Sequence, residues 1–254
     1  MNLKRALVPF VLLTTASILY FGTFNYPFVF DTKAHILYNP YIHELLPWEA
    51  PIAKSRLLIH ASLAINYALG GFDVLGYRLF NVVVHFLNAW LLFSILSQTL
   101  TRHRQYSTDS EGALLAFVAS IAWLIHPLQT QSVTYVIQRS ESMAALAYFF
   151  AFWAFLKGGI LSEKQNVFWL LISIVAAFLG CMTKPSLVTL PIALFAFDII
   201  FSEAKVKTIL RARGLYYVGL LASWFFLFYL MKASTSLYMA SAGFGSAAVS
   251  SGAY

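Results

Sequence analysis

Three side chains of this sequence stand out as groups that could do chemistry. Lys184 directly precedes Pro185, and proline at a first helical position marks the start of a helix, whose N-terminus can bind an anion. Arg139 offers a forked set of N–H donors that suits phosphate. Asp31 follows the apolar residues 27–30 and could accept a proton from a hydroxyl group. Together these groups predict the binding of a phosphate beside an activated hydroxyl.

Further polar residues gather around Arg139. His126 ends an apolar run, and Gln131, Arg139 and Glu141 follow within fifteen residues. The alternative for each cation is a side chain that only extends to the membrane interface. The alternative for Asp31 is a solvated loop acid or a helix cap. The convergence of two cations with His126 is the reason to predict a lipid-phosphate site.

The composition places these groups in a membrane protein. Of 254 residues, 60% are apolar, 17% are aromatic and 11% are charged, whereas soluble domains carry roughly 25% charged residues. This excludes a soluble globular enzyme and a disordered tail. The single cysteine, Cys181, excludes a disulfide scaffold. In a membrane protein the distribution of the net charge of +7 matters more than its total, and we predict no nucleic-acid partner.

The apolar runs predict an all-α bundle of about seven membrane spans. A spanning helix needs about 20 mainly apolar residues, and the runs do not alternate as the strands of a β-barrel do. The first span follows Lys4 and Arg5 but is too long for a cleaved signal peptide, so we predict an uncleaved anchor. The predicted spans are residues 6–30, 79–101, 112–138, 142–156, 165–183, 185–201 and 214–231.

The cations predict a cytoplasmic N-terminus. With that orientation, ten of the 17 lysines and arginines fall in the N-terminus and in three short cytoplasmic loops, as the positive-inside rule requires. Residues 24–77 then form a long outer loop. Within it, residues 55–69 predict a helix on the outer leaflet, with an apolar stripe through Leu57, Ala61 and Ile65 and with Arg56, His60 and Asn66 off that stripe.

A polar face runs along the second predicted span. Arg78, Asn81, His85 and Asn88 are spaced i, i+3, i+7 and i+10, which places them on one side of a helix. Such a face must turn toward the bundle or toward a wet cavity. It forms hydrogen bonds between helices, or its outer end, near Arg78, lines a substrate cleft. We find no glycine-rich phosphate loop, zinc spacing or nucleophile elbow in the sequence.

Four segments, in order, resemble the GT-C superfamily of lipid-dependent glycosyltransferases. They are FVFDTKAHILYNPYI, SRLLIHASLAINYALGGFDVLGYRLFNVVVHFLNAWLLF, HPLQTQSVTYVIQRSE and MTKPSLVTLP. The nearest branch is that of the transmembrane and tetratricopeptide-repeat O-mannosyltransferases and their bacterial relatives. The resemblance covers roughly residues 20–200.

The resemblance implies roles for individual residues. Asp31 matches the first acid of a paired motif and would be the catalytic base. Thr32 stands where the family has a second acid, which puts a metal held by both acids in doubt, so we predict neither a metal nor another cofactor. Arg139 and Lys184 would lie near the lipid phosphate, with His126, Gln131 and Glu141 in the polar cluster beside them, and Arg56 matches a family arginine. We predict His126 as a third phosphate ligand; Arg56, Gln131 and Glu141, together with Arg78 from the polar face of the second span, are predicted to line the substrate cleft.

We therefore expect a membrane glycosyltransferase that moves a mannose-like hexose, with inversion, from a polyprenyl or dolichyl phosphate to a protein or glycan hydroxyl. The alternative is a non-catalytic scaffold or a transporter for glycolipids. Short loops favour the bacterial cytoplasmic membrane, with the site on the extracytoplasmic side, over the endoplasmic reticulum. Residues 1–232 would form the catalytic module, and residues 233–254 an interrupted outer loop of a truncated product.

Overall fold

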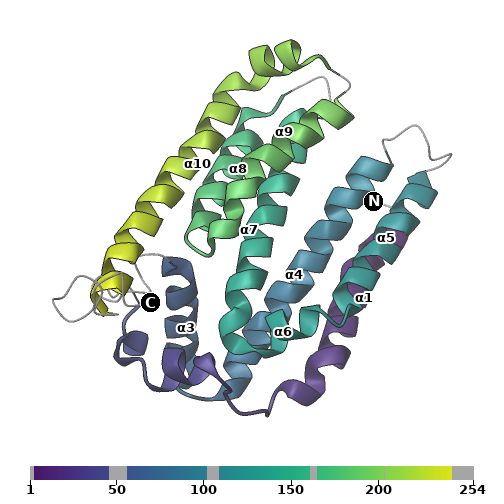
Figure 1. The fold of residues 1–254 in the computed structure, drawn as a ribbon. Coiled ribbons are helices and arrows are strands. Elements are labelled where there is room, and N and C mark those ends of the chain that lie inside the picture. Colours follow the sequence, from purple (N-terminus) through teal and green to yellow (C-terminus); the bar gives the residue numbers. More distant parts are fainter. Residues whose placement is uncertain (1–2, 46–55, 102–108, 161–164, 203, 242–254) are drawn as a thin grey trace.

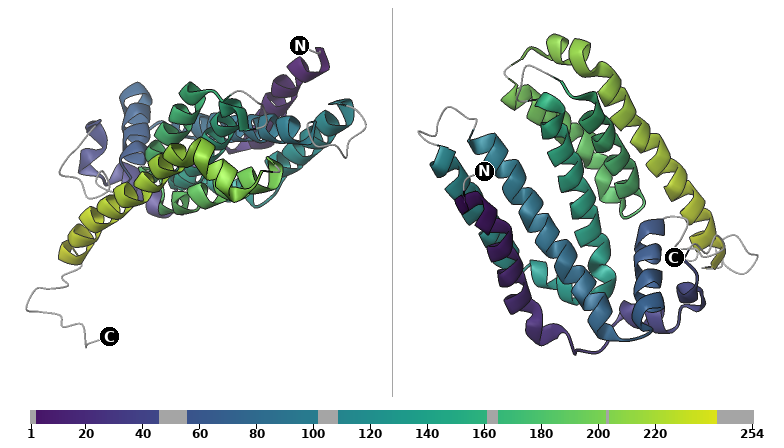
Figure 2. Two further views of the ribbon diagram at one scale, coloured as in Figure 1. Left: turned by 90° about the horizontal axis from the view of Figure 1, so that it is seen from above. Right: turned by 180° about the vertical axis from the view of Figure 1, so that it is seen from behind.

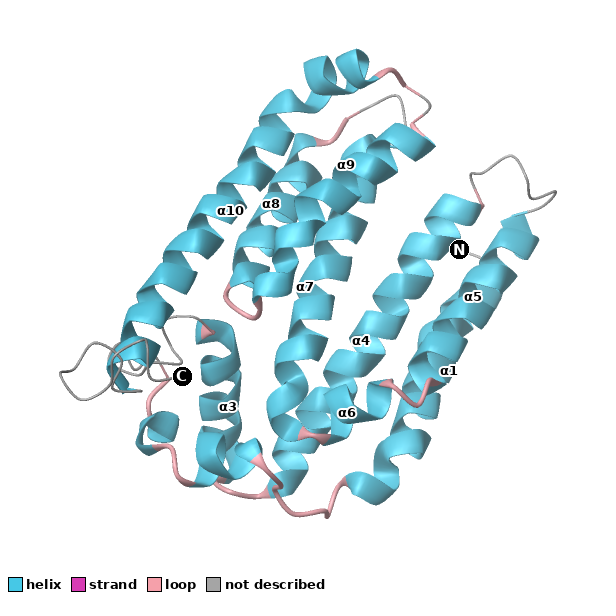
Figure 3. Ribbon diagram, viewed as in Figure 1, coloured by secondary structure: helices cyan, strands magenta, loops and turns pink. Residues whose placement is uncertain are grey.

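The structure is a computed structural model that describes residues 3–45, 56–101, 109–160, 165–202 and 204–241. All regular elements in these ranges are helices, and no strand occurs among them (Figure 3). The predicted all-α class is therefore confirmed. Pro47, Glu49 and Pro51 of the predicted outer loop lie outside the described residues, as do Arg102, Arg104 and Lys164.

Each predicted span overlaps at least one helix, and several boundaries differ. The first span was predicted to reach residue 30, but α1 ends at Tyr20 and a short 3₁₀ helix follows it to Thr23. The third run does not continue to residue 138: its helix ends at Ile125, ahead of Pro127, which cannot donate a backbone hydrogen bond. Pro185 begins only a short 3₁₀ helix, Pro185–Thr189. The helices are α1 (Leu3–Tyr20), α3 (Leu57–Gly70), α4 (Val74–Leu100), α5 (Asp109–Ile125), α6 (Gln129–Thr134), α7 (Arg139–Phe155), α8 (Val167–Cys181), α9 (Leu190–Phe201) and α10 (Val206–Ser241).

Within the described ranges, three stretches are long and apolar enough to cross a membrane, judged by length and composition: Val74–Leu100, Val136–Gly159 and Val206–Lys232. The other helices of the bundle are apolar but shorter, as α8 and α9 are. A helical membrane protein is thus supported, and the count of seven spans stays a prediction. α10 continues as a helix to Ser241, beyond the predicted end of the last span.

α7 occupies the centre of the bundle, between α4 and α8 (Figure 1). On one side, α1, α4 and α5 share a core that contains Leu12, Val82 and Leu124. On the other side, α7 to α10 enclose a second core around Phe155 and Leu194. The view from above in Figure 2 shows that the bundle is broader than it is thick.

The segments predicted to lie outside the membrane gather at one end of the bundle, the lower end in Figure 1. They are residues 24–45 and α3, both within the predicted outer loop. α6, which falls in the third predicted span, lies near this end, and the turn between α8 and α9 meets the start of α3 higher up. A third core cluster, which includes Phe28, Ile36 and Tyr77, packs residues 24–45 and α3 against the start of α4. We call this end the outer end, following the predicted orientation.

α3 is a helix as predicted, and the side that packs against the bundle is the one off its apolar stripe. Ile65 of the apolar stripe is 48% exposed, whereas His60 and Asn66 are buried. The reason is polar: His60 Nε2 lies 2.9 Å from the Glu44 carbonyl oxygen, and the Asn66 amide donates to the Gly76 carbonyl and accepts from Arg139. Hydrogen-bonding partners inside the bundle therefore set the rotation of α3.

The polar face of α4 forms hydrogen bonds between helices, which confirms the first of its two predicted roles. Arg78, Asn81, His85 and Asn88 are all buried. Asn81 donates to the carbonyls of Val133 and Val136, and Asn88 donates to that of Ser142. His85 Nε2 lies 3.0 Å from the carbonyl oxygen of Leu124, in the last turn of α5. Two of the accepting carbonyls, those of Leu124 and Val133, lie in the last turns of α5 and α6, where helix carbonyls lack intrahelical partners.

A buried ion pair joins α9 to α10 at the opposite end of the bundle. Asp198 is fully buried and accepts hydrogen bonds from Arg213 Nη1 at 2.5 and 2.7 Å and from the Tyr217 hydroxyl at 2.6 Å. Arg213 departs from helical geometry, with φ −131°, where α10 changes direction. The pair explains why an acid, Asp198, occurs within the sixth predicted span, residues 185–201.

We predict that Asp198→Ala lowers the free energy of unfolding by about 3–5 kcal/mol, because it leaves the Arg213 guanidinium buried without its carboxylate. Denaturant unfolding in detergent micelles measures the change. Glu44→Ala, at an exposed acid, is the control and should have little effect. Because Asp198→Leu/Arg213→Met removes both charges, it should recover much of the loss. Equal effects of Asp198→Ala and Glu44→Ala would contradict the prediction.

Candidate functional site

Asp31 is exposed at the outer end, in the turn that leads from α1 to the short helix Lys33–Leu37. The Thr32 and Lys33 amides donate to the carbonyls of Val29 and Phe30, at 3.2 and 3.0 Å. The Asp31 amide donates to the Tyr135 hydroxyl at 3.0 Å. Sequence reasoning missed Tyr135: 104 residues separate it from Asp31, and no local pattern marks it.

His35 connects Asp31 electrostatically with Arg56. Burial lowers the pKa of His35 below its ordinary value; the Asp31 carboxylate acts to raise it, and Arg56 acts to lower it further. Arg56 is exposed and directly precedes α3. The predicted base and the predicted cleft residue Arg56 therefore lie within electrostatic range of one side chain.

Lys184 and Glu141 form an ion pair between the turn after α8 and the first turn of α7. Their side chains are 30% and 44% exposed, so both remain accessible from outside. α3 reaches this turn, because the Leu58 amide donates to the Met182 carbonyl at 3.4 Å. We call Asp31, His35, Arg56, Glu141 and Lys184 the outer polar rim.

Arg139 lies behind the rim and is fully buried. Its guanidinium donates to Ser62 Oγ, Asn66 Oδ1 and the Tyr77 carbonyl, at 3.2, 2.8 and 3.0 Å, and it packs over the rings of Tyr77 and Phe80. These contacts tie α3 and α4 to the start of α7. The prediction that Arg139 binds a lipid phosphate stays a prediction; in this structure its Nη groups already have partners inside the protein.

His126 takes a separate place. It is exposed at the turn between α5 and α6, where its Nδ1 accepts from the Leu128 amide at 3.2 Å. No hydrogen bond or ion pair joins it to Arg139 or Lys184 in the described part of the chain. The joint binding of a lipid phosphate by His126, Arg139 and Lys184 stays a prediction.

Arg78 and Gln131 line one cavity at the outer end, of about 670 Å³. Arg78 is buried, and its Nη atoms donate to the carbonyls of Thr134, Tyr26 and Pro27. The cavity is therefore lined by aromatic rings, amides and hydroxyls. The Nη groups of its one arginine, Arg78, already donate to backbone carbonyls. We call it the side cavity; its lining is Tyr26, Pro27, Val29, Phe30, Arg78, Pro127, Leu128, Thr130, Gln131, Thr134 and Tyr135.

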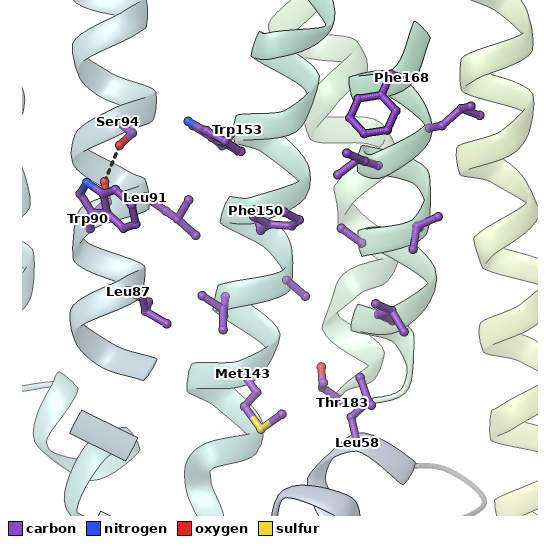
Figure 4. A pocket seen from close by; sticks show the side chains of 17 residues that line it. Leu58, Leu87, Trp90, Leu91, Ser94, Met143, Phe150, Trp153, Phe168 and Thr183 are labelled. Atoms are coloured by element: carbon purple, nitrogen blue, oxygen red, sulfur yellow. Dashed lines mark hydrogen bonds between the residues drawn. The ribbon is translucent and has the colours of Figure 1, made fainter. Parts of the chain in front are cut away.

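A second cavity, of about 820 Å³, lies between α4, α7 and α8, and we call it the apolar groove (Figure 4). Leu87, Trp90 and Leu91 of α4 face Phe150 and Trp153 of α7 across it. Its outer mouth is formed by Leu58, Met143 and Thr183. Thr183 adjoins Lys184, so this end of the groove lies next to Lys184 of the outer polar rim.

Thr32 is almost fully buried, and its hydroxyl has no hydrogen-bond partner within the described ranges. An acid at this position would place a carboxylate away from water, which is costly without a partner. Among the described residues, no group of three or more His, Cys, Asp or Glu side chains is arranged to hold a metal ion. The prediction that the protein uses no metal stays a prediction.

We predict that Arg139 stabilises the fold, whereas Lys184 contributes little to stability. Arg139→Met should lower the free energy of unfolding by about 3 kcal/mol or more, because it leaves buried oxygens without donors. Lys184→Met, in a partly exposed pair, should change it by less than about 1 kcal/mol. Denaturant unfolding of both variants measures the two changes in the free energy of unfolding. Similar decreases in both variants would contradict the prediction.

We also predict that Thr32→Val raises the free energy of unfolding by about 1 kcal/mol, because it removes a buried hydroxyl that has no partner. Thr32→Asp should lower it by about 2 kcal/mol or more. Thr23→Val is the matched control: Thr23 Oγ1 donates to the Tyr20 carbonyl at 2.7 Å, so its loss should destabilise. The same sign for both Val variants would show that Thr32 has a partner after all.

Comparisons with known proteins bear on what this site does. No protein-family model matches the chain, and no solved structure matches it. The chain is 28% identical over 189 residues to Protein O-mannosyl-transferase Tmtc1 of Drosophila melanogaster, an alignment that covers 68% of this chain and 20% of that protein. It is 25% identical over 211 residues to Protein O-mannosyl-transferase TMTC4 of Homo sapiens, covering 74% and 28%. It is 28% identical over 181 residues to Protein O-mannosyl-transferase Tmtc3 of Drosophila melanogaster, covering 61% and 19%.

The chain thus spans between a fifth and about three-tenths of the length of these relatives. The predicted resemblance is confirmed: over about 60–74% of its length, this chain is homologous to proteins named as protein O-mannosyl-transferases, which are glycosyltransferases of the GT-C type.

Proposed function

We propose that this chain belongs to an enzyme that transfers a mannose-like hexose from a polyprenyl or dolichyl phosphate to a hydroxyl of a protein or glycan. The observation that carries the proposal is the position of the apolar groove. It reaches Thr183, next to Lys184, and the segment that carries the exposed Asp31 lies toward the same end of the bundle. A donor with a long apolar tail and a charged phosphate has the same two-part character.

The donor would lie with its tail between α4, α7 and α8. The groove walls are almost entirely hydrocarbon and aromatic rings, so a prenyl chain there is bound by burial of apolar surface. The phosphate would then reach the rim, where Lys184 can exchange part of its ion pair with Glu141 for the phosphate oxygens. Arg56, exposed at the start of α3, would add a second cation. Arg139 and His126 stay predicted phosphate ligands.

The acceptor would enter through the side cavity. Phe30 and Tyr135 both line this cavity. Phe30 directly precedes Asp31 in the chain, and the Tyr135 hydroxyl accepts a hydrogen bond from the Asp31 amide. Its rings and neutral polar groups, Gln131 among them, suit a hydroxyl-bearing acceptor that carries no charge. Asp31 would thus lie between the two substrates.

The reaction would be a direct displacement at the anomeric carbon. Asp31 removes the proton of the acceptor hydroxyl, and the acceptor oxygen bonds to that carbon. The bond from the carbon to the phosphate oxygen breaks, and its electron pair leaves with the lipid phosphate. Lys184 stabilises the negative charge of the leaving group. The configuration inverts, and the chemistry uses no nucleotide or metal.

The outer end would face the extracytoplasmic side of the membrane. The bacterial cytoplasmic membrane stays the predicted location and the endoplasmic reticulum its alternative. The matching relatives named above are animal proteins, so they give no support to the bacterial location.

The base is tested with Asp31→Asn, which keeps the shape of the side chain but accepts no proton. Transfer from a polyprenyl-phosphate sugar, measured with the full protein in vesicles, should fall about 10²- to 10⁴-fold. Donor binding should persist. Full activity of Asp31→Asn would show that another group is the base.

The donor site is tested with Lys184→Met. Because Lys184 would contact the phosphate both before and during bond cleavage, the variant should raise KM for the donor and lower kcat, together by about 10²-fold in kcat/KM. Lys207→Met, an exposed lysine on α10 at the opposite end, is the matched control. Equal effects of the two variants would reject the site. Donor binding to the wild type without any turnover would favour the alternative, a non-catalytic scaffold.

A further inference from the structure

Phe30, directly before Asp31, has an unusual backbone conformation. Its φ is +48°, and it is the one non-glycine residue with positive φ in the described ranges. The left-handed region brings Cβ too close to the following carbonyl oxygen, and a bulky residue adopts it only when its surroundings impose it. The Phe30 side chain is 82% exposed, so its own burial does not provide that constraint.

Tyr135 contacts the strained turn in two ways. Its hydroxyl accepts the hydrogen bond of the Asp31 amide at 3.0 Å. Its ring meets the Phe30 ring edge-on, with 6.1 Å between centroids and 83° between planes. The contact therefore involves both the strained residue and the backbone of the proposed base.

The segment that carries Tyr135 is itself held in place by α4. Arg78 Nη1 donates to the Thr134 carbonyl at 2.7 Å, and Asn81 donates to the carbonyls of Val133 and Val136. Arg78 Nη2 also donates to the carbonyls of Tyr26 and Pro27, which precede the strained turn. One buried arginine thus connects the two segments that meet at Asp31, and Tyr135 completes the link.

We propose that Tyr135 is a positioning residue, whose hydroxyl and ring hold Phe30 in the left-handed conformation and so present the Asp31 carboxylate to the acceptor. The inference rests on the proposed function in one respect, that Asp31 is the base. Without the Tyr135 hydroxyl, the turn relaxes toward negative φ at Phe30, and the direction of the Asp31 side chain changes with it.

The activity test uses Tyr135→Phe, which removes one oxygen and keeps the ring. We expect kcat to fall about tenfold, because misplacement of a catalytic group is costly, while KM for the donor changes less than about twofold. Tyr229→Phe, at an exposed tyrosine of α10, is the matched control and should keep full activity. Unchanged kcat in Tyr135→Phe would overturn the proposal.

The rescue test separates backbone strain from the loss of a ring contact. Phe30→Gly and Phe30→Ala both remove the ring, but only glycine adopts positive φ without strain. In the Tyr135→Phe background, Phe30→Gly should recover at least about threefold more kcat than Phe30→Ala. Equal kcat for the two double variants would overturn the proposal.

Hydrogen exchange of the peptide that covers residues 29–33 gives a readout that needs no activity. In Tyr135→Phe the amides of Asp31, Thr32 and Lys33 should exchange faster; in Tyr135→Phe/Phe30→Gly, those of Thr32 and Lys33 should again be protected. Unchanged exchange in Tyr135→Phe would overturn the proposal that Tyr135 holds the backbone of residues 30–31. Altered exchange in Tyr135→Phe together with full activity of Asp31→Asn would have a different meaning. Tyr135 would then hold the backbone of residues 30–31 as proposed, but Asp31 would not be the base.

Discussion

The outer end of this bundle depends on one constraint: backbone carbonyls that lose their helical partners in apolar surroundings must find other donors. The chain breaks its helices repeatedly here, after α1, after α5 and before α7. Side chains of α4 supply the missing donors, with Arg78 bound to the carbonyls of Thr134, Tyr26 and Pro27 and with Asn81 bound to those of Val133 and Val136. An irregular, site-bearing backbone can therefore persist beside apolar helices, and the candidate base lies on it.

The few charges of the chain are divided between structure and surface. Arg139 is buried and its hydrogen bonds join helices that are far apart in sequence, whereas the Asp198–Arg213 pair joins the consecutive helices α9 and α10 inside the bundle. Lys184, Glu141, Arg56 and Asp31 remain accessible at the outer end. This division separates residues that build the bundle from residues that can meet a substrate. It also places the accessible cation beside the mouth of the apolar groove, where a charged lipid headgroup would lie.

Much of the fold was predictable because apolar periodicity reports burial locally. The helices of the seven apolar runs and the inward turn of the Asn81 and His85 face follow from spacing and composition, whereas the helix break ahead of Pro127 lies inside a predicted span. Predictions were weaker where rotation or partner choice mattered. The apolar stripe of α3 marked the side suited to lipid, but it did not show that hydrogen bonds of His60 and Asn66 hold the other side against the bundle. Arg139 and Lys184 looked alike in sequence, yet one is fully buried and the other is accessible.

The sequence by itself determined that this is an apolar helical protein, which residues are polar within it, and which family its ordered segments resemble. These are properties of composition and of short-range pattern. Only the tertiary structure decided that Tyr135 holds the Asp31 backbone, that Leu58 meets the turn before Lys184, and that a groove opens there. These contacts join residues far apart in the chain, and their geometry depends on how whole helices pack, which no local spacing encodes.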